Sequence, residues 1–497
     1  MTIWVDLIFT GPDGLEVFMN TGKIMNIIGK ILLVEVLLML PSLLVSLIYR
    51  DGDTMAFVYT MIPAAIVAVL LMLVRQQQKR MSSRDGYFIV AMAWIIISVV
   101  GAFPLYLAGD FTSYWGALFE IVSGFTTTGA SVLAEPGVLG HGVAFWRCFT
   151  HWVGGMGVLV FVLMVIPMEN DNSMHLVRAE VPGPTAGKLV PRMRTTSMIL
   201  YGIYAAMTLV LVVILKCLGM KIFDAFCIGF ATAGTGGFAL NSAGIAGYGS
   251  PAIEIVLGIF MILFGINFNT YFLLLLRKFK EVLTSEETAV YFGVIGVAVA
   301  AISINTLSCF SSVGETVRTA FFQVASIITT TGFATVDFSL WPEFSKHLIV
   351  LLMIIGACAG STGGGLKISR VIILFKSFVA EIKQILNPKE ILSIRLNGKN
   401  VDKKTLNSTR IYFAAYIILI CLFTLIISLD GLDLTTNLTA VLSCFNNIGP
   451  GLNLVGPMAN FGIYSDWVKV VLSLAMLTGR LEIFPMFLLF AKSAHDR

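Results

Sequence analysis

Residues 119–131 read FEIVSGFTTTGAS, a short apolar stretch that runs into threonines and a glycine. Three later segments follow the same pattern, with ATAGTGGF at 231–238, SIITTTGFAT at 326–335 and SCFNNIGPG at 443–451. With Gly237 as the anchor of the second segment, successive anchor glycines are 108, 95 and 117 residues apart. Self-similarity at a nearly regular period indicates a repeat architecture. One Thr-Thr-Gly is an ordinary turn, but four copies after truncated apolar segments predict four equivalent units.

The composition predicts that these units lie in a membrane. Of the 497 residues, 57% are hydrophobic and only 12% are charged, whereas a soluble domain is about one quarter charged. A helix needs about 20 apolar residues to cross the hydrocarbon core. Apolar segments of that length predict ten spans, at residues 27–49, 56–74, 88–108, 144–166, 197–218, 252–276, 288–308, 347–375, 409–429 and 464–491.

The basic residues predict the orientation of the spans. Lys and Arg accumulate in the links 75–84, 178–194 and 277–280 and in the long linker 376–410. Cytoplasmic loops carry an excess of these residues, so we expect the links and both termini on the cytoplasmic side of the membrane. The Thr/Gly segments then lie in the opposite loops, after apolar stretches too short to cross. Irregular backbone at membrane depth must be buried in protein or line water, so the four loops should converge on one aqueous path.

The residue types of the four loops fit a filter for a desolvated alkali cation. Such an ion needs several oxygens of modest field strength to replace its hydration shell, and backbone carbonyls supply them. Glycine permits the backbone angles that inward-pointing carbonyls require, and the short preceding helices would aim their negative C-terminal ends at the ion. The expected filter residues are Thr127, Thr128, Gly129, Thr235, Gly236, Gly237, Thr330, Thr331, Gly332, Asn447, Ile448 and Gly449.

In the second loop, two alignments give two different candidates for the filter glycine. Gly237 matches when the loops are aligned on the following Phe238, as in Gly332-Phe333, and Gly236 would then supply a carbonyl. Gly234 matches when they are aligned on the preceding Phe230, as Phe125 precedes Gly129. We favour Gly237.

The eighth expected span is interrupted by residues 356–367, which read GACAGSTGGGLK. Five glycines in ten residues do not sustain a helix, because each costs about 1 kcal/mol relative to alanine. The run is either a kink for close packing or a mobile loop in the pore. It resembles a phosphate-binding loop only faintly, since Leu366 separates Gly365 from Lys367 and the required spacing fails. The candidate gate residues are Gly356, Gly360, Ser361, Thr362, Gly363, Gly364, Gly365 and Arg480.

Charged residues in apolar segments are further candidates. Arg480 lies in the tenth expected span, where an ionisable side chain is costly and by default functional; the alternative is a salt bridge to Glu482 or another helix. Glu120 and Arg318 lie in the short helices of repeats one and three, and we expect them to pair or to brace the filter. Four aspartates near the outer ends could concentrate cations at the mouth: Asp110, Asp337, Asp433 and Asp466. The alternative for each of these charges, and for Glu120 and Arg318, is an ordinary solvated surface position.

The four loops, the order helix–loop–helix repeated four times and two extra N-terminal spans resemble the TrkH/KtrB family of potassium-uptake proteins, and the TrkH branch in particular. The resemblance implies one filter glycine per repeat, at Gly129, Gly332 and Gly449 and in the second loop. Four glycines imply preference for K⁺, while a serine in the first loop would relax selectivity toward Na⁺. It also implies that residues 356–366 form an intramembrane gating loop, and that Arg480 faces the conduction path opposite that loop.

The resemblance further implies a homodimer with one pore per subunit and a cytosolic ring of TrkA-like regulatory subunits that bind NAD, ATP or ADP. This chain lacks a dinucleotide fingerprint after a strand, so we expect any nucleotide on the partner. The linker 376–410 and the loop 178–194 are candidate docking surfaces for the ring, and membrane lipid surrounds the chain. The positive charge of the linker and the loop is also what the excess of Lys and Arg on the cytoplasmic side alone would produce. It does not indicate nucleic-acid binding.

The sequence therefore predicts an all-α polytopic protein of the cytoplasmic membrane that moves K⁺. The expected units are an N-terminal two-helix region (1–86) and repeats one to four (87–180, 181–280, 281–395 and 396–497). The competing function is a secondary transporter that couples K⁺ to Na⁺ or H⁺, which needs ionisable residues at the midplane. An enzyme is not expected, because no nucleophile, base and orienting group can be assigned. Seven dispersed cysteines without a CxxC pair argue against disulfides and a zinc site.

Overall fold

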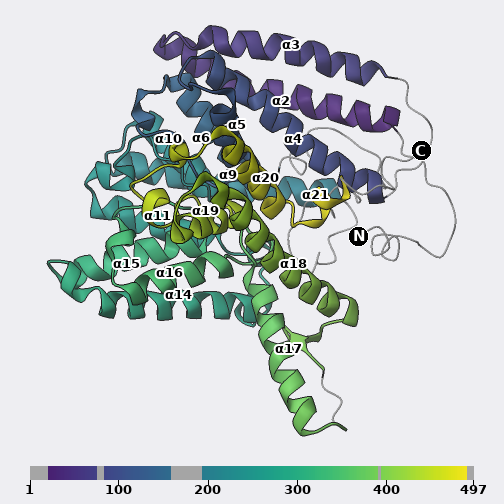
Figure 1. The fold of residues 1–497 in the computed structure, drawn as a ribbon, viewed down its shortest axis with the longest axis vertical. Helices are drawn as coiled ribbons and strands as arrows, with labels where there is room; N and C mark the ends of the chain where they lie inside the picture. The colour runs from purple at the N-terminus through teal and green to yellow at the C-terminus, as the bar shows by residue number, and fades with distance from the viewer. Residues whose placement is uncertain (1–20, 75–82, 158–192, 390–392, 490–497) are drawn as a thin grey trace.

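The structure is a computed structural model that describes residues 21–74, 83–157, 193–389 and 393–489. Within those residues it is almost entirely helical (Figure 1). Among the described residues, six helices are long and apolar enough to cross a membrane, or seven if the bent pair α11–α12 is counted as one span. The six continuous helices correspond to the expected spans at 27–49, 56–74, 88–108, 197–218, 288–308 and 409–429.

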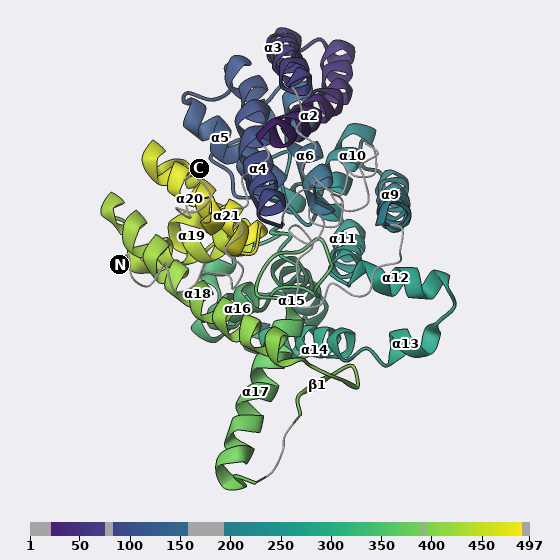
Figure 2. The same cartoon turned by 90° about the vertical axis from the view of Figure 1, so that its right-hand side faces the viewer.

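An antiparallel pair, α2 (Thr21–Tyr49) and α3 (Thr54–Leu73), precedes four units of similar order. Each unit has a long first helix, a short helix that leads into a Thr/Gly or Asn/Gly loop, and a second helix. The first helices are α4 (Ser83–Leu107), α9 (Met193–Cys217), α14 (Glu286–Asn305) and α18 (Lys403–Ile427). The short helices are α5 (Tyr114–Phe125), α10 (Ile222–Ala233), α15 (Val313–Ile328) and α19 (Leu434–Asn446). The units surround a central region of coil (Figure 2).

The second helix is interrupted in the second, third and fourth units, which the expectation of ten spans missed in two of them. The segment expected as a continuous span at 252–276 forms α11 (Pro251–Phe264) and α12 (Phe268–Leu275), which meet at 86°. The segment at 464–491 forms α20 (Asp466–Arg480) and α21 (Phe484–Leu488). In the third unit, α16 (Glu343–Ile355) is separated from α17 (Ile368–Leu386) by the glycine-rich segment. In the first unit, α6 (His141–Gly155) ends just before the described residues stop at 157, so the part of the expected span at 158–166 lies outside them.

Side chains fix where three of the short helices begin. Ser113 caps α5 by accepting a hydrogen bond from Trp115 N, Ser312 caps α15 by accepting from Glu315 N, and Asp433 caps α19 by accepting from Thr436 N. A side-chain oxygen at the N-cap satisfies a backbone N–H that has no partner within the helix. Because the starts are fixed, the length of each short helix fixes where its C-terminal end meets the following loop.

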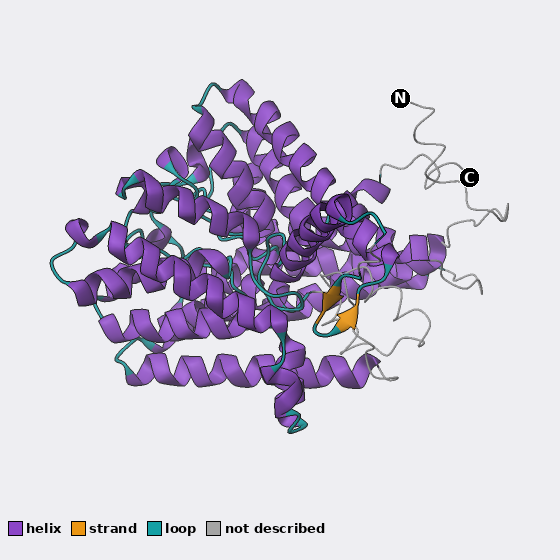
Figure 3. Ribbon diagram, turned by 90° about the horizontal axis from the view of Figure 1, so that it is seen from below, coloured by secondary structure: helices purple, strands orange, loops and turns teal. Residues whose placement is uncertain are grey.

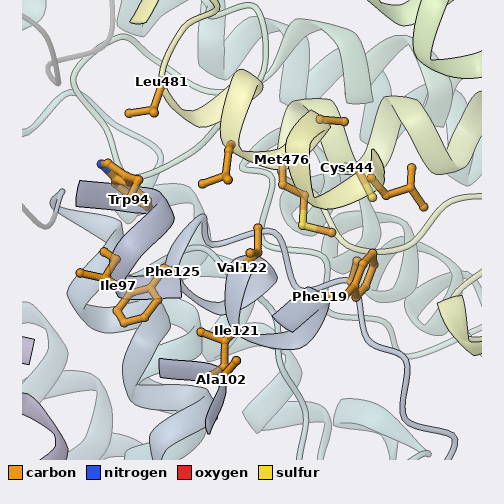
Figure 4. Packing of buried hydrophobic residues seen from close by; sticks show 14 of the residues in the cluster. Trp94, Ile97, Ala102, Phe119, Ile121, Val122, Phe125, Cys444, Met476 and Leu481 are labelled. Atoms are coloured by element: carbon orange, nitrogen blue, oxygen red, sulfur yellow. The ribbon is translucent and has the colours of Figure 1, made fainter. Parts of the chain in front are cut away.

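Two large apolar clusters hold the helices of the described residues together. One joins α2 and α3 to the first and fourth units, and the other joins the second and third units. In the first cluster, Phe119 and Val122 of α5 pack with Cys444 of α19 and Met476 of α20 (Figure 4). The first and fourth units therefore share one core, although they are more than 300 residues apart in the chain.

Two features project from the helical body. Helix α17 extends away from the other helices (Figure 1), and a two-stranded hairpin of β1 (Arg395–Leu396) and β2 (Lys399–Asn400) follows it (Figure 3). Asn397 at the hairpin tip accepts a hydrogen bond from Glu286 N at the start of α14 (2.7 Å). Lys376 of α17 pairs with Glu286 and donates to Arg395 O, so the hairpin joins α14 to α17.

Candidate functional site

The same backbone conformation recurs where each short helix runs into its loop. Thr127, Thr235, Thr330 and Asn447 have φ of 56°, 55°, 59° and 55°. Left-handed backbone is uncommon for any residue except glycine and is unusual for β-branched threonine. One residue later, the amide of Thr128, Gly236, Thr331 or Ile448 donates to the carbonyl five residues back at 2.8–2.9 Å. This is the hydrogen bond of a Schellman helix end, and it turns each loop away from the helix axis.

The four loops meet in a closed ring. An ideal Cβ placed on Gly129 would lie 1.9 Å from Gly236 O, one on Gly237 1.9 Å from Thr331 O, and one on Gly332 1.8 Å from Ile448 O. A Cβ on Gly449 would lie 3.0 Å from Thr128 O, which closes the ring. Each glycine therefore packs against the carbonyl that precedes the anchor glycine of the next loop.

The backbone geometry distinguishes Gly237 from Gly234 in the second loop. Gly237 has φ of 75°, as Gly129, Gly332 and Gly449 have φ of 80°, 84° and 109°. Gly234 instead caps the end of α10 in right-handed helical backbone, the position that Thr126 and Thr329 hold after α5 and α15. Gly237 is thus the geometrical equivalent of the other three glycines, while Gly236 supplies the carbonyl before it.

The ring opens on one side into a cavity of about 130 Å³. Gly129, Gly237, Gly332 and Gly449 all line it, and Arg147 is the only charged side chain among its lining residues in the described part of the chain. The four aspartates expected at the mouth do not line it. Asp433 caps α19, Asp337 caps a short 3-10 helix, and Asp466 accepts a hydrogen bond from Ser113 Oγ.

The outer segments after the first two glycines are also tied together. Glu135 accepts a hydrogen bond from Ser242 Oγ at 2.5 Å and another from Gly137 N. These bonds hold the pKa of the Glu135 carboxyl below its ordinary value. Glu120 and Arg318 do not pair with each other: Glu120 binds Arg147, and Arg318 binds Glu254 at 2.9 Å.

The glycine-rich segment 356–367 forms a compact loop on the other side of the ring. Its two ends meet, because Leu366 N donates to Ile354 O and Ile368 N donates to Ala357 O. Gly364 N donates to Thr330 Oγ1 at 2.6 Å, so the loop contacts the third Thr/Gly loop directly. At the bend of the second unit, Phe268 N donates to Gly360 O and Cys358 N donates to Gly265 O.

Arg480 joins this loop to the first unit. Its guanidinium donates to Thr362 O at 2.9 Å and to Gly154 O and Gly155 O at 2.5 and 2.8 Å. The salt bridge to Glu482 considered for it is not formed. Glu482 instead pairs with both terminal nitrogens of Arg370, at 3.1 and 2.5 Å. Arg480 therefore spans the ends of α6 and α20 and the middle of the glycine-rich loop.

Several residues at this site were missed by the sequence reasoning. Lys367 Nζ donates to Gly363 O, and Glu287 accepts from Ala359 N at 2.7 Å, so both charged side chains hold the loop. Arg147 was missed as the partner of Glu120. The sequence could have identified Arg147 by the argument used for Arg480, because a charged side chain in an apolar segment is costly and marks a candidate functional residue.

Comparison with known proteins places this geometry in a family. The sequence model of the TrkH family, described as a cation transport protein, matches residues 54–496. The chain belongs to the TrkH family. It is 35% identical over 480 residues to the Trk system potassium uptake protein TrkH of Escherichia coli K12, an alignment that covers 95% of this chain and 99% of that protein. It is 32% identical to TrkG of the same strain, with 95% and 99% covered.

The solved structures include a TrkH-family member of the same fold. The crystal structure of the potassium transporter TrkH from Vibrio parahaemolyticus matches with a TM-score of 0.87 and 30% identity, over 96% of this chain and 100% of that one. The expected family and the expected all-α polytopic membrane fold are therefore confirmed. The chain is a multi-pass membrane protein.

Proposed function

We propose that this TrkH-family chain moves K⁺ across the cytoplasmic membrane through a filter formed by the four-loop ring, with the loop 356–367 and Arg480 as its gate. The observation that carries the proposal is the closed ring, in which each anchor glycine packs on a carbonyl of the next loop. Such packing stacks backbone oxygens of four segments round one axis, the ligand set that a dehydrated K⁺ requires. The curated relatives are named potassium uptake proteins.

The helix ends support the same assignment. All four short helices have their C-terminal ends at the ring, where the partial negative charge of a helix lies. Three of the four left-handed residues are threonines, and backbone strain of this kind persists where function requires the geometry. The filter would comprise residues 127–129, 235–237, 330–332 and 447–449, and K⁺ is the cargo. No nucleotide site is assigned to this chain.

The gate loop is in a position to block the path. Ten of the twelve residues from 356 to 367 are buried, and the loop contacts the third Thr/Gly loop, the α11–α12 bend and Arg480. Arg480 in turn binds the end of α6. A loop that fills the space next to the ring stops a permeating ion until it moves. Its glycines permit that movement, and the hydrogen bonds of Arg480, Lys367 and Glu287 oppose it.

The proposed function predicts passive, K⁺-selective flux. Purified protein in liposomes, with an imposed membrane potential and no other gradient, should carry K⁺ down its electrochemical gradient and carry Na⁺ far more slowly. The fluxes are measured separately for the two ions in matched vesicles. Flux that arises only when a Na⁺ or H⁺ gradient is added would overturn the channel and establish a coupled transporter.

We further propose that two chains form a homodimer through α17, each chain with its own pore. Helix α17 leaves the helical body and exposes an apolar stripe. The stripe comprises Phe375, Phe378, Ile382, Ile385 and Leu386. Lys376, Glu381 and Lys383 interrupt it in sequence, so the helix is amphipathic. A second copy covers such a stripe by an isologous contact, in which the same surface patch serves both subunits.

The dimer predicts a change in mass for a substitution in the stripe. Phe378→Glu combined with Ile385→Glu should convert the detergent-solubilised dimer to a monomer, measured by light scattering on a size-exclusion column. Leu340→Glu, an exposed apolar residue on another element, is the matched control and should leave the mass unchanged. A dimer that persists in the double variant would exclude α17 as the interface.

A cytosolic nucleotide-binding ring is the proposed regulatory partner. The linker 376–410 supports it, because the hairpin β1–β2 contacts both α14 and α17 through Glu286, Asn397 and Lys376. A partner that moves the hairpin would also move α17, which begins directly after the gate loop. The other candidate docking segment, 178–194, lies almost wholly outside the described residues. Both termini are proposed to face the same cytosolic side.

A further inference from the structure

Buried serines anchor two of the four filter loops. Six residues before the anchor glycine, Ser326 Oγ donates to Phe333 O at 2.6 Å in the third repeat, and Ser443 Oγ donates to Gly449 O at 2.5 Å in the fourth. Each bond ties the short helix to the backbone at its own glycine. In these two repeats the helix therefore fixes the position of the filter backbone directly.

The first and second repeats lack this anchor. Ser123 holds the equivalent position in the first repeat, but its hydroxyl is buried and has no hydrogen-bond partner among the described residues. The second repeat has Ala231 there, which has no hydroxyl. The backbone after Gly129 and after Gly237 must be held by something else.

The buried ion pair of Glu120 and Arg147 contacts both of these segments. Glu120 on α5 is fully buried, Arg147 on α6 is 2% exposed, and Arg147 Nε lies 2.5 Å from Glu120 Oε1. On the side of the first loop, Ser131 Oγ and Val132 N donate to the two Glu120 oxygens at 2.8 and 3.0 Å.

On the side of the second loop, Arg147 Nη1 donates to Ala239 O at 3.0 Å. Its guanidinium also lies 3.5 Å from the ring centroid of Phe238, the residue directly after Gly237. The planar fork of arginine makes several such contacts at once, which an ammonium group does not. One ion pair therefore fixes the outgoing backbone of two adjacent filter loops.

The third repeat shows an uncharged version of the same tie. Gln323 lies nine residues before Gly332, as Glu120 lies nine before Gly129. Gln323 Nε2 donates to Thr335 Oγ1 at 3.3 Å. The position thus serves to join the helix to the segment after the glycine. This position is charged only in the first repeat, where Glu120 binds Arg147 and Arg147 contacts the neighbouring second loop.

We propose that the Glu120–Arg147 pair is a positioning element that holds the first and second filter loops in register and thereby sets the discrimination of K⁺ from Na⁺. The inference rests on the proposed K⁺ filter. Selectivity depends on where carbonyl oxygens stand around the ion. Loss of the pair frees the segments after Gly129 and Gly237 together and lets the ring adapt to the smaller ion.

The charges also act on the ion path directly. Arg147 lines the cavity beside the ring, and Glu120 neutralises it. Glu120→Gln leaves an uncompensated cation at the mouth, whereas Arg147→Gln removes that cation. By its charge alone, Glu120→Gln should therefore lower K⁺ flux and Arg147→Gln should raise it. A loss of positioning lowers the K⁺/Na⁺ flux ratio in both, which separates the two effects.

The test is the K⁺/Na⁺ flux ratio of full-length protein in liposomes for wild type, Glu120→Gln, Arg147→Gln and the double variant. Each single substitution should lower the ratio by about tenfold or more, since displacing a supported site by about 1 Å has effects of that order. The double variant should lower it no further, because residues that act as one unit are not additive. A ratio within about twofold of wild type in both single variants would overturn the inference.

Matched controls separate this inference from the proposed function. Glu254→Gln breaks the Glu254–Arg318 pair, which joins α11 to α15 without contacting a filter loop, and should leave the ratio unchanged. Wild type that does not prefer K⁺ would refute the filter itself. Wild type that selects K⁺ while the variants keep its ratio would refute only the role of the pair.

Milder variants keep the test decisive if the buried substitutions prevent folding. Arg147→Lys keeps the charge but does not contact Glu120 and Ala239 O at once. Ser131→Ala, at a half-buried position, removes one bond to Glu120 and the side-chain acceptor of Leu133 N. Both should lower the ratio by less than Arg147→Gln lowers it, with an unchanged melting temperature. An unchanged ratio in both, in folded protein, would also overturn the inference.

Discussion

Alanine at Gly332 is expected to abolish selective K⁺ flux. Its Cβ would lie 1.8 Å from Ile448 O, and real Cβ atoms do not approach backbone that closely. The carbonyl of the fourth loop must therefore shift by an ångström or more, and misplacement on that scale costs about 100-fold in comparable sites. Gly129→Ala and Gly237→Ala should behave alike, because their Cβ atoms would lie 1.9 Å from the next loop. The measurement is K⁺ and Na⁺ flux into liposomes at equal protein content.

The ring itself supplies a graded comparison. At Gly449 the nearest backbone oxygen would be 3.0 Å from a new Cβ, so Gly449→Ala should retain more K⁺ flux than the other three. Gly109 has φ of 87° with open space around it, so Gly109→Ala carries the same left-handed strain of about 1–2 kcal/mol without a clash. It should leave both fluxes unchanged. Equal losses in Gly109→Ala and Gly332→Ala would attribute the effect to strain, and the filter assignment would lose its support.

The repeat was the part of the fold that the sequence predicted best. Four Thr/Gly or Asn/Gly segments after short apolar stretches predicted four equivalent helix–loop units, and the structure has them. The position of Gly237 was only one of two alignments until the backbone angles were known. Sequence alignment could not decide which glycine is equivalent to Gly129, because Gly234, Gly236 and Gly237 are the same residue type. They differ only in their position relative to the end of α10, which the sequence does not show.

The breaks in α11–α12 and α20–α21 were not predicted, for a physical reason. Apolar composition runs through the first break, and only Arg480 and Glu482 interrupt it at the second. A rule based on hydrophobic length therefore reads each segment as one span. The bend at Gly265–Asn267 is stabilised by hydrogen bonds from the glycine-rich loop about 90 residues later, including Phe268 N to Gly360 O. Contacts between residues that far apart in the chain cannot be predicted from the sequence around the bend. In the third unit five glycines made the interruption visible.

The partners of the charged side chains could not be predicted from neighbouring residues in the sequence either. Arg480 and Glu482 are close in sequence, which suggested a salt bridge between them. The chain turns sharply after Arg480, since Glu482 and Ile483 have φ of 57° and 68°, and the two side chains contact different elements. Glu482 pairs with Arg370 more than 100 residues away, as Glu120 pairs with Arg147 on another helix. Sequence identified Arg480 and Glu120 as costly charges, and only the fold showed Arg147 and the pairing of each group.

Arg480→Ala is expected to raise K⁺ flux by about tenfold or more. The substitution removes donors to Thr362 O, Gly154 O and Gly155 O, which hold the gate loop against α6. Hydrogen bonds to a charged group are each worth about 1.5–3 kcal/mol, and about 1.4 kcal/mol is a tenfold change in a two-state population. Alanine also removes a fixed positive charge from the proposed ion path, which lowers the barrier to a cation. Flux is compared in liposomes at equal protein content.

Two further variants separate the tether from the charge. Arg480→Lys keeps the charge but does not reach three carbonyls at once, so its flux should lie between wild type and Arg480→Ala. Arg480→Gln removes the charge and keeps an amide donor, so flux close to that of alanine would assign the larger effect to charge. Arg410→Ala, at an exposed arginine that pairs with Glu381 at 3.5 Å, is the control and should not change flux. Unchanged or lower flux in Arg480→Ala would contradict the proposed gate, because the bonds to Thr362 O, Gly154 O and Gly155 O that it removes tie the loop to α6.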